Sequence, residues 1–297
     1  MHLPVGRYVN ILLLGLIVTL LIIVYYPVAI DFNVYNPFWN GYDKLTRILN
    51  ATLVNGDYDT ILPVKPEGYM LILIPYKPLT VDDLNAILRF VGNGGVLLLM
   101  DDFGYGNMVL EAMNAPLRFK RGVLIDPLYY YKCTRIVRIR SFYGVLTGLS
   151  EVYLNYASVL EVRDESRVRV LALSSYFSFL DEDFDGVYDP GELYGPLVVA
   201  AEFSYGRGRV IVISDPSIGI NIMLDYGDNL KLLLKLCSGF NILVDQKYTP
   251  KNLHTLAKES VISILSLISR KPILTPLILI VAVSISYLIG RRFGVRL

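Results

Sequence analysis

Cysteine and histidine are scarce in this 297-residue sequence, which holds two of each. Cys133 and Cys237 lie far apart and form no C-x-x-C pair and no cluster with histidine, so a metal–thiolate site is not expected. The two thiols are either one disulfide or two unrelated core residues. His2 stands at the N-terminal end and His254 in a late helical segment, and neither has the neighbours of a catalytic base or a metal ligand.

An excess of basic residues is also missing, because 28 Lys and Arg stand against 27 Asp and Glu. A nucleic-acid-binding domain normally carries a basic patch, so this class of function is not expected. The chain has no G-x-S-x-G elbow, no P-loop and no dinucleotide-binding G-x-G-x-x-G. Gln246 is the only glutamine, and depletion of thermolabile residues is typical of thermophiles.

Apolar residues make up 54% of the chain, and much of this excess lies at the two ends. Residues Ile11–Ile30 carry no charge and would span about 30 Å as a helix. A cleaved signal peptide is the alternative, but no A-x-A site follows. A second apolar segment, Ile273–Ile289, follows Pro272. We therefore expect one transmembrane helix at each end.

The charges near these segments predict a two-pass protein of the cell membrane. Arg7 and the C-terminal Arg291, Arg292 and Arg296 favour cytoplasmic termini and an extracytoplasmic domain, although Arg270 and Lys271 favour the opposite orientation. The expected organisation is an anchor at 1–30, an α/β domain at 31–252, a juxtamembrane amphipathic helix at 253–271, and a transmembrane helix with a basic tail at 272–297.

The central part alternates strand and helix patterns. The apolar run Met70–Pro75 predicts a strand, Thr80 caps a helix, and Val96–Met100 predicts a second strand covered on both faces. Strand, helix and strand within about thirty residues form a βαβ unit with parallel strands. An amphipathic pattern predicts a further helix at 38–50.

The later part of the chain predicts half-exposed strands that would extend the sheet in an antiparallel manner. Alternation of arginine with apolar residues at 135–140 and 167–173 indicates such strands. Two more strands are expected at 198–203 and 209–214, followed by a helix at 228–237 whose predicted apolar face is Leu230, Leu233, Leu234 and Cys237. Residues 253–268 predict a last amphipathic helix.

One acidic segment is the most specific motif. Residues 181–192 read DEDFDGVYDPGE and match the calcium-loop pattern D-x-[DN]-x-[DN]-G-x₅-E. Hard oxygen ligands at this spacing suit Ca²⁺, and a turn glycine stands at the sixth position. The expected ligands are Asp181, Asp183, Asp185, the carbonyl of Val187, Asp189 and Glu192. The flanks are not helical, so an isolated loop is expected; a solvated acidic turn without an ion is the alternative.

A second candidate site lies where predicted parallel strands end. Asp101, Asp102 and Asn107 follow one strand, and Asp215 and Ser217 follow another. Ligand sites of parallel α/β domains form outside the carboxyl ends of the strands, where carboxylates bind a metal or act in acid–base catalysis. The alternative is that these aspartates cap helices and bind loop amides.

The order of several segments resembles a family of prokaryotic, archaeal-type membrane proteins of unknown function with a class I glutamine amidotransferase-like domain. The resemblance extends over roughly residues 35–245. It depends on these segments: Pro78–Thr80, Gly94–Asn107, the acidic loop with Gly195–Leu197, Gly206–Ser217 and Asn221.

The resemblance implies a flavodoxin-like three-layer sandwich with a mostly parallel sheet. Active amidotransferases use a cysteine at a strand-to-helix elbow with a histidine and a glutamate, whereas this chain has Asp101 and Asp102 at the elbow and Asp215 on the late strand. The resemblance therefore implies a catalytically inactive domain. It also implies a partner such as a MoxR-type ATPase system or a transporter component.

Three functions remain open from the sequence. The first is a binding scaffold for a protein partner, stabilised by calcium. The second is a carboxylate- or metal-dependent hydrolase using the strand-end aspartates. The third is an accessory subunit of a transport or export complex.

Overall fold

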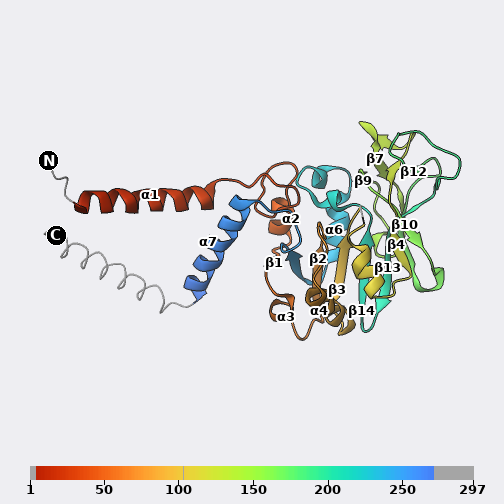
Figure 1. The fold of residues 1–297 in the computed structure, drawn as a ribbon. Helices are drawn as coiled ribbons and strands as arrows, with labels where there is room; N and C mark the ends of the chain where they lie inside the picture. Colours follow the sequence, from red (N-terminus) through yellow and green to blue (C-terminus); the bar gives the residue numbers. More distant parts are fainter. Residues whose placement is uncertain (1–4, 103, 271–297) are drawn as a thin grey trace. The chain divides into compact units, whose positions relative to one another are not determined.

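The computed structural model describes residues 5–102 and 104–270. The chain divides into two compact units, Ala29–Pro250 and a second unit formed by Met1–Val28 with Lys251–Leu297. The unit Ala29–Pro250 is an α/β domain with a mixed sheet (Figure 1).

Five neighbouring strands of this sheet are parallel. In spatial order they are β1 (Thr52–Val54), β15 (Asn241–Asp245), β2 (Tyr69–Leu73), β3 (Val96–Met100) and β14 (Gly208–Ile213). Every residue of β3 is buried: Leu98 faces one core cluster, and Leu97 and Leu99 face the other. The strand is apolar at every position because both faces of the sheet are covered.

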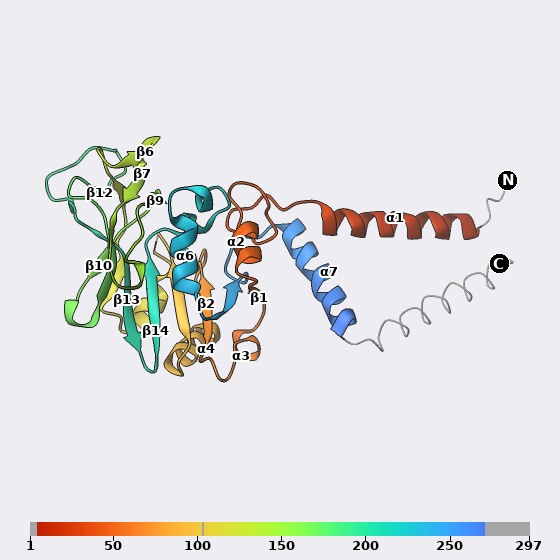
Figure 2. The same cartoon turned by 180° about the vertical axis from the view of Figure 1, so that it is seen from behind.

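Helices cover the two faces of the parallel strands (Figures 1 and 2). On one face lie α3 (Tyr58–Ile61), α4 (Val81–Gly92) and α5 (Asn107–Ala112), and on the other lie α2 (Asp43–Ile48) and α6 (Asn229–Cys237). The hydroxyl of Thr80 accepts the N–H of Asp83 at 3.3 Å and caps α4 as predicted. Ile87 and Phe90 of α4 are buried, and each such side chain contributes about 1.5–3 kcal/mol to stability.

The sheet continues beyond β14 with antiparallel strands. These are β13 (Val198–Tyr205), β10 (Leu160–Val162) and β4 (Leu117–Phe119), with β11 (Arg169–Leu173) paired to β13 and β8 (Ser141–Phe142) paired to β11. The β13–β14 turn needs glycine at Gly206, because φ is +55° and a Cβ would lie 2.7 Å from the backbone of Gly92.

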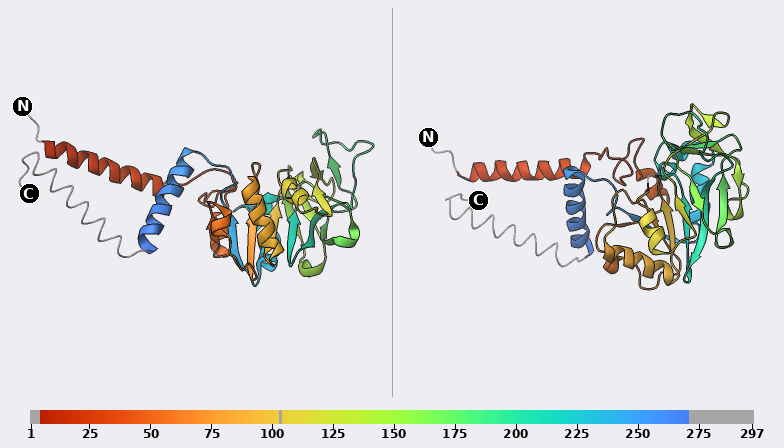
Figure 3. Two further views of the ribbon diagram at one scale, coloured as in Figure 1. Left: turned by 60° about the horizontal axis from the view of Figure 1, so that its bottom comes forward. Right: turned by 45° about the vertical axis from the view of Figure 1, so that its right-hand side comes forward.

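Two small sheets lie at the end of the domain opposite β1 (Figure 3). One pairs β12 (Phe179–Asp181) with β5 (Val123–Ile125), and the other contains β6 (Tyr130–Tyr131), β7 (Cys133–Ile139) and β9 (Val152–Asn155). The described part of the domain also contains short 3₁₀ turns: η1 (Gly144–Leu146), η2 (Glu165–Arg167), η3 (Pro216–Gly219) and η4 (Met223–Asp225).

Several local predictions from the sequence are wrong in detail. The helix expected at 38–50 contains only Asp43–Ile48, and Trp39 is exposed outside it. The arginine-rich strand β7 belongs to a separate small sheet and does not extend the main one. In α6 the buried face includes Leu232 and Leu236, whereas Leu234 is exposed, because the helix is rotated relative to the predicted apolar face.

The second unit contains α1 (Val5–Tyr25) and α7 (Leu253–Arg270). The ring of His254 packs edge-on against Tyr26 at 5.7 Å, and Lys258 Nζ donates to the carbonyl of Tyr26 at 2.9 Å. The amphipathic helix predicted at 253–268 is therefore α7, and it packs within its own unit.

The expected membrane spans are corrected by the structure. Among residues 5–102 and 104–270, no helix is both long enough and apolar enough to cross a bilayer. Helix α1 (Val5–Tyr25) begins before the predicted apolar segment Ile11–Ile30 and ends ahead of Pro27. This finding overturns the predicted flanking spans and two-pass topology as far as the described residues extend, whereas a bilayer partner stays a prediction. The segment Ile273–Ile289 lies outside the described residues.

Candidate functional site

The acidic loop 181–192 begins at the end of β12 and is closed at its base. Phe179 bridges Tyr194 across the loop, and the N–H of Leu180 donates to the carbonyl of Leu193 at 2.8 Å. On its other side β12 pairs with β5, placing Asp181 opposite Val123. The loop is therefore held at both ends by regular backbone pairing.

Three of the predicted ligands come together in this loop. The carboxylate oxygens of Asp181, Asp183 and Asp185 lie within 4.8 Å of one another. Asp181 is buried, and its two oxygens accept the N–H groups of Phe184 at 2.8 Å and Gly186 at 3.0 Å. The backbone of the loop thus turns around the carboxylate of Asp181, which brings Asp183 and Asp185 close to it.

The other predicted ligands are placed differently. The two oxygens of Glu192 accept the N–H groups of Glu182 at 2.8 Å and Asp189 at 3.0 Å, so this side chain closes the loop through the backbone. The N–H of Val187 donates to Asp185 at 2.7 Å. Asp189 and Glu192 do not belong to the compact carboxylate group.

The electrostatics of the loop fit a divalent cation. Desolvation and the neighbouring carboxylates of Asp185 and Asp183 raise the pKa of Asp189. Gly186 adopts φ of +86°, the conformation that the sixth position of a calcium loop requires. Asp181, Asp183 and Asp185 are the residues that would hold the ion, which would supply positive charge and no redox chemistry.

Two connected surface hollows lie near this loop, and the second of them includes Tyr188 of the loop. The first, which we name the arginine hollow, has a volume of about 490 Å³. Its lining is Tyr129, Arg138, Arg140, Ser141, Tyr143, Leu173, Ser174, Ser175, Tyr176, Phe177 and Pro196. The second, the apolar hollow, has about 420 Å³ and is lined by Pro127, Tyr176, Phe177, Ser178, Phe179, Tyr188 and Tyr194. The shared residues Tyr176 and Phe177 connect the two.

A buried carboxylate fixes the aromatic side chains of the arginine hollow. Asp126 is fully buried and accepts the N–H groups of Leu128 at 2.9 Å and Tyr129 at 2.7 Å and the hydroxyl of Ser175 at 2.5 Å. The rings of Tyr129 and Phe177, which follow these anchored residues, stack at 6.1 Å with an interplanar angle of 25°. Asp126 thus positions two turns from distant parts of the chain.

The acidic loop contacts the same surface through one of its own side chains. Tyr188, within the loop, packs edge-on against Phe179 at 5.6 Å, and both rings line the apolar hollow. A change in the loop backbone therefore moves a wall of the hollow. The exposed Tyr176 and Phe177 complete that wall, at 78% and 54% exposure.

The predicted strand-end residues serve the local backbone. Asp101 accepts the N–H groups of Asp102, at 2.8 Å, and of Gly106. Asn107 exchanges two hydrogen bonds with the main chain of Phe119, at 2.9 and 3.0 Å. These contacts match the capping alternative that the sequence left open.

Asp215 is also held by amides, and it lies deep in the domain. It is fully buried and accepts the N–H groups of Asn155 at 2.7 Å and Ser217 at 2.6 Å. Burial raises the pKa of Asp215 to about 7, against the opposite effect of these hydrogen bonds. The charges of Asp215 and Asp102 add to the burial that raises the pKa of Tyr42, whose hydroxyl donates to the carbonyl of Pro216.

Sequence reasoning missed a buried cluster where β15 ends near the start of α4. Asp83 is almost fully buried, receives a hydrogen bond from the hydroxyl of Tyr248 and pairs with Lys247 Nζ at 2.5 Å. Tyr58 donates to Asp245 at 2.5 Å. Burial acts to raise the pKa of Asp83, but the hydrogen bonds from Lys247 and Tyr248 outweigh it and lower that pKa. Asp83 and Tyr248 are 165 residues apart, so no local sequence pattern predicts their contact.

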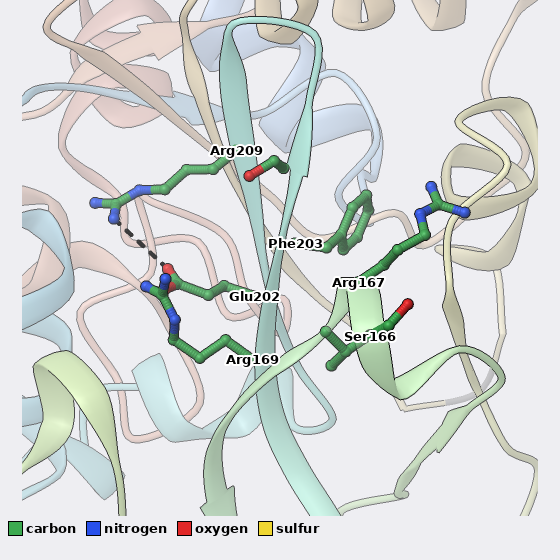
Figure 4. Close-up of a pocket in the computed structure, with 8 residues that line it drawn as sticks. Ser166, Arg167, Arg169, Glu202, Phe203 and Arg209 are labelled. Atoms are coloured by element: carbon green, nitrogen blue, oxygen red, sulfur yellow. Dashed lines mark hydrogen bonds and ion pairs between the residues drawn. The ribbon is translucent and has the colours of Figure 1, made fainter.

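Another hollow, of about 520 Å³, lies around the β13–β14 hairpin (Figure 4). Glu202, 8% exposed, accepts from Arg169 at 2.6 Å and pairs with Arg209 at 3.5 Å. Arg167 lies across the hairpin from this group and donates to the carbonyl of Asn114. Because Glu202 pairs with two guanidiniums, we interpret the hollow as a structural ion-pair cluster that keeps a net positive charge.

The two cysteines do not form a disulfide. Cys133 is exposed and Cys237 is buried, and both are free thiols. Of the two alternatives that the sequence left open, the unrelated thiols fit the structure, but only Cys237 is the core residue that was expected.

The fold and sites described above define an α/β domain with a mixed sheet, an acidic loop and an aromatic surface. Residues 34–237 match the model of a family described as a domain of unknown function, DUF4350, and the chain belongs to that family. This is a coarser result than the predicted resemblance, because the match identifies neither an amidotransferase-like nor an archaeal-type family. No curated protein matches the sequence.

Solved structures give only distant likenesses. The mmIFT52 N-terminal domain is 14% identical with a TM-score of 0.49, over 66% of this chain and 90% of that one. A ThuA-like protein from Bacteroides uniformis ATCC 8492 is 15% identical with a TM-score of 0.41, over 66% and 79%. A beta-galactosidase from Bacillus circulans sp. alkalophilus is 14% identical with a TM-score of 0.36, over 57% and 22%. At these TM-scores the likenesses carry no inference about function.

Proposed function

We propose that this domain is a binding module that receives a protein partner on its two connected hollows and is stabilised there by calcium. One observation carries the proposal: Tyr176 and Phe177 are exposed and are shared by both hollows. Large aromatic side chains exposed side by side lose favourable burial unless a partner covers them.

The composition of the surface supports a protein partner. Tyrosine and arginine are the residue types that contribute most to binding energy at protein interfaces. The arginine hollow combines both with serine hydroxyls, and the apolar hollow adds proline and more aromatic rings. Asp126 holds the anchored turns before any partner arrives, which lowers the entropy lost on binding.

The calcium part of the proposal follows from the carboxylate group. Asp181, Asp183 and Asp185 repel one another at the observed spacing, and a divalent cation relieves that repulsion. Through Tyr188 and Phe179 the same ion would stabilise the wall of the apolar hollow. The expected role of the ion is structural.

A crosslinking experiment tests the partner site. Benzoylphenylalanine placed at Tyr176 of the full chain should give, in cells of the source organism, a crosslinked protein of defined mass. The same probe at Tyr105, an exposed tyrosine in the strand-end loop, serves as the matched control.

The outcomes separate the candidate functions. Crosslinking at Tyr176 that is absent at Tyr105 and lost in Phe177→Ala supports the aromatic surface as the binding site. Crosslinking at Tyr105 alone contradicts it and favours the strand-end edge. Absence of any defined product at Tyr176 also contradicts the proposal.

A further inference from the structure

The two hollows differ in chemistry, and the difference constrains what binds them. The apolar hollow is lined almost wholly by aromatic rings and a proline, apart from Ser178. The arginine hollow contains two guanidiniums, and none of the described residues that line it is acidic. A ligand that fills both therefore needs an apolar part and an anionic part close together.

Only one of the two arginines is compensated. Arg138 pairs with Glu151 at 3.7 Å and lies over the ring of Tyr153 at 5.6 Å. Arg140 is exposed, and no hydrogen bond or ion pair joins its guanidinium to another described residue. Arg140 is thus the cation at this surface that remains able to bind a carboxylate.

Hydroxyl groups beside Arg140 extend the same preference. Ser175 donates its proton to Asp126, whereas Ser174 accepts from the hydroxyl of Ser178 and the N–H of Leu197, so both side chains already bind within the domain. Ser141 and Tyr143 line the hollow, and their hydroxyls make no hydrogen bond to the part of the chain that the structure describes. Both can donate to an anionic oxygen held by Arg140.

We propose that the occupant is an acidic peptide segment of the partner protein that carries one bulky apolar side chain. The apolar side chain fills the apolar hollow against Phe177 and Tyr188, while a neighbouring carboxylate binds Arg140. This inference rests on the proposed function, because it names the chemistry of the partner at the same surface.

The acidic loop sets the conditions for such binding. Six acidic residues lie between 181 and 192, and the loop reaches the apolar hollow through Tyr188. Their charge repels an acidic segment, and one bound calcium ion lowers that negative charge by two. Binding should therefore be measured at a fixed calcium concentration of about 1 mM, the level that extracellular-type loops require.

Fluorescence anisotropy with designed peptides tests the inference on the full chain. The probe is a labelled nine-residue peptide with one phenylalanine flanked by glutamates, compared with peptides carrying glutamine or lysine in place of glutamate and one carrying alanine in place of phenylalanine. The glutamate peptide should bind more tightly than the other three, and raising the salt from about 50 to 200 mM should weaken it.

Variants locate the interaction. Arg140→Gln should weaken the glutamate peptide about two- to fivefold, the range that one exposed charge pair supplies. Arg140→Glu should weaken it further and strengthen the lysine peptide. Arg207→Gln, an exposed arginine at the β13–β14 turn, is the matched control and should leave binding unchanged.

Several results would overturn the inference. These are equal binding of the glutamate and lysine peptides, no binding of any peptide, or no effect of the Arg140 variants. Displacement by a neutral glucose hexasaccharide would instead favour a glycan, and concentration-dependent self-association lost in Phe177→Ala would favour a second copy of this chain. If the probe at Tyr176 crosslinks a protein and Arg140→Glu does not change the yield, the proposed function is supported. The inference that the partner binds through an acidic segment is then wrong.

Discussion

The hydroxyl of Ser175 donates a 2.5 Å hydrogen bond to the buried carboxylate of Asp126, which joins two turns 49 residues apart. The same carboxylate receives the amides of Leu128 and Tyr129. Asp126 therefore positions the turns that carry the aromatic surface, although it lines neither hollow. Replacing Asp126 is a direct test of the site.

Replacing Asp126 with alanine should destabilise the domain by about 2–4 kcal/mol, because three hydrogen bonds to a buried carboxylate are lost. Asp126→Asn should cost less, since one oxygen remains for the amides of Leu128 and Tyr129. Urea unfolding of the full chain measures both. Asp164→Ala, which removes a half-buried aspartate that accepts the N–H of Ser166 in a similar turn, should cost under about 1 kcal/mol. Equal costs at the two positions would contradict the special role of Asp126.

Calcium at about 1 mM should stabilise the full chain by roughly 0.4–1.4 kcal/mol for a dissociation constant of about 10⁻⁴ to 10⁻³ M. That corresponds to an increase in Tm of about 1–6 °C. Thermal unfolding with EDTA and then with calcium measures the shift. Asp183→Asn should abolish it, whereas Asp225→Asn, at an exposed carboxylate paired with Lys44, should not. If the wild-type Tm is the same in EDTA and calcium, residues 181–192 are an acidic turn.

Protons should compete with calcium at a higher pH than isolated aspartates would imply. Desolvation and the nearby Asp185 and Asp183 raise the pKa of Asp189, so this group takes up a proton before an ordinary aspartate does. Calcium affinity should therefore fall as the pH is lowered toward the usual aspartate range. Calorimetric titration between pH 7 and pH 4.5 measures the decline, which Asp189→Asn should reduce.

Asp83 should contribute to acid denaturation. Its pKa is lowered in the folded state, so its stabilisation is complete above the ordinary aspartate pKa and is lost as the pH falls through the lower folded value. Asp83→Asn should reduce stability at neutral pH and flatten the stability curve below about pH 4. Asp82→Asn, at the exposed neighbouring position, should preserve the slope. Unfolding in urea across the acid range decides between them.

The two thiols should differ sharply in reactivity. Cys133 is exposed, whereas burial raises the pKa of the Cys237 thiol to about 12. A thiol reagent should therefore modify one group in the native protein and a second only after unfolding. Cys133→Ser should leave no rapidly reacting thiol. Rapid modification of both native thiols would contradict the buried position of Cys237.

Local patterns predicted the parts of the fold that local chemistry determines. Thr80 precedes two acidic residues and an amphipathic run, and it caps α4 as expected. The acidic loop was found because its spacing encodes a backbone turn within twelve residues. The length of α2 was overestimated, since the apolar side chains upstream of Asp43 lie outside the helix.

Contacts between distant segments could not be read in the same way. Asp126 precedes a proline and binds amides two and three residues ahead, which is a readable turn, but its bond to Ser175 depends on how β5 and β12 pair. The partnership of Asp83 with Tyr248 likewise depends on where β15 enters the sheet. The bounds of the N-terminal helix were misplaced because apolar composition does not show that α1 begins at Val5 and ends before Pro27.

The paired base of the acidic loop has a consequence for how this surface can vary. Phe179 and Tyr194 hold the two ends of the loop side by side, so residues 182–192 can be exchanged without separating these ends. A short turn in their place would cost little chain entropy and would keep β12 (Phe179–Asp181) in place. Such a change would delete Tyr188 together with Asp183, Asp185, Asp189 and Glu192 while leaving the Asp126 bond intact. Relatives could therefore gain or lose ion sensitivity and one wall of the apolar hollow in a single insertion or deletion, while retaining the arginine hollow.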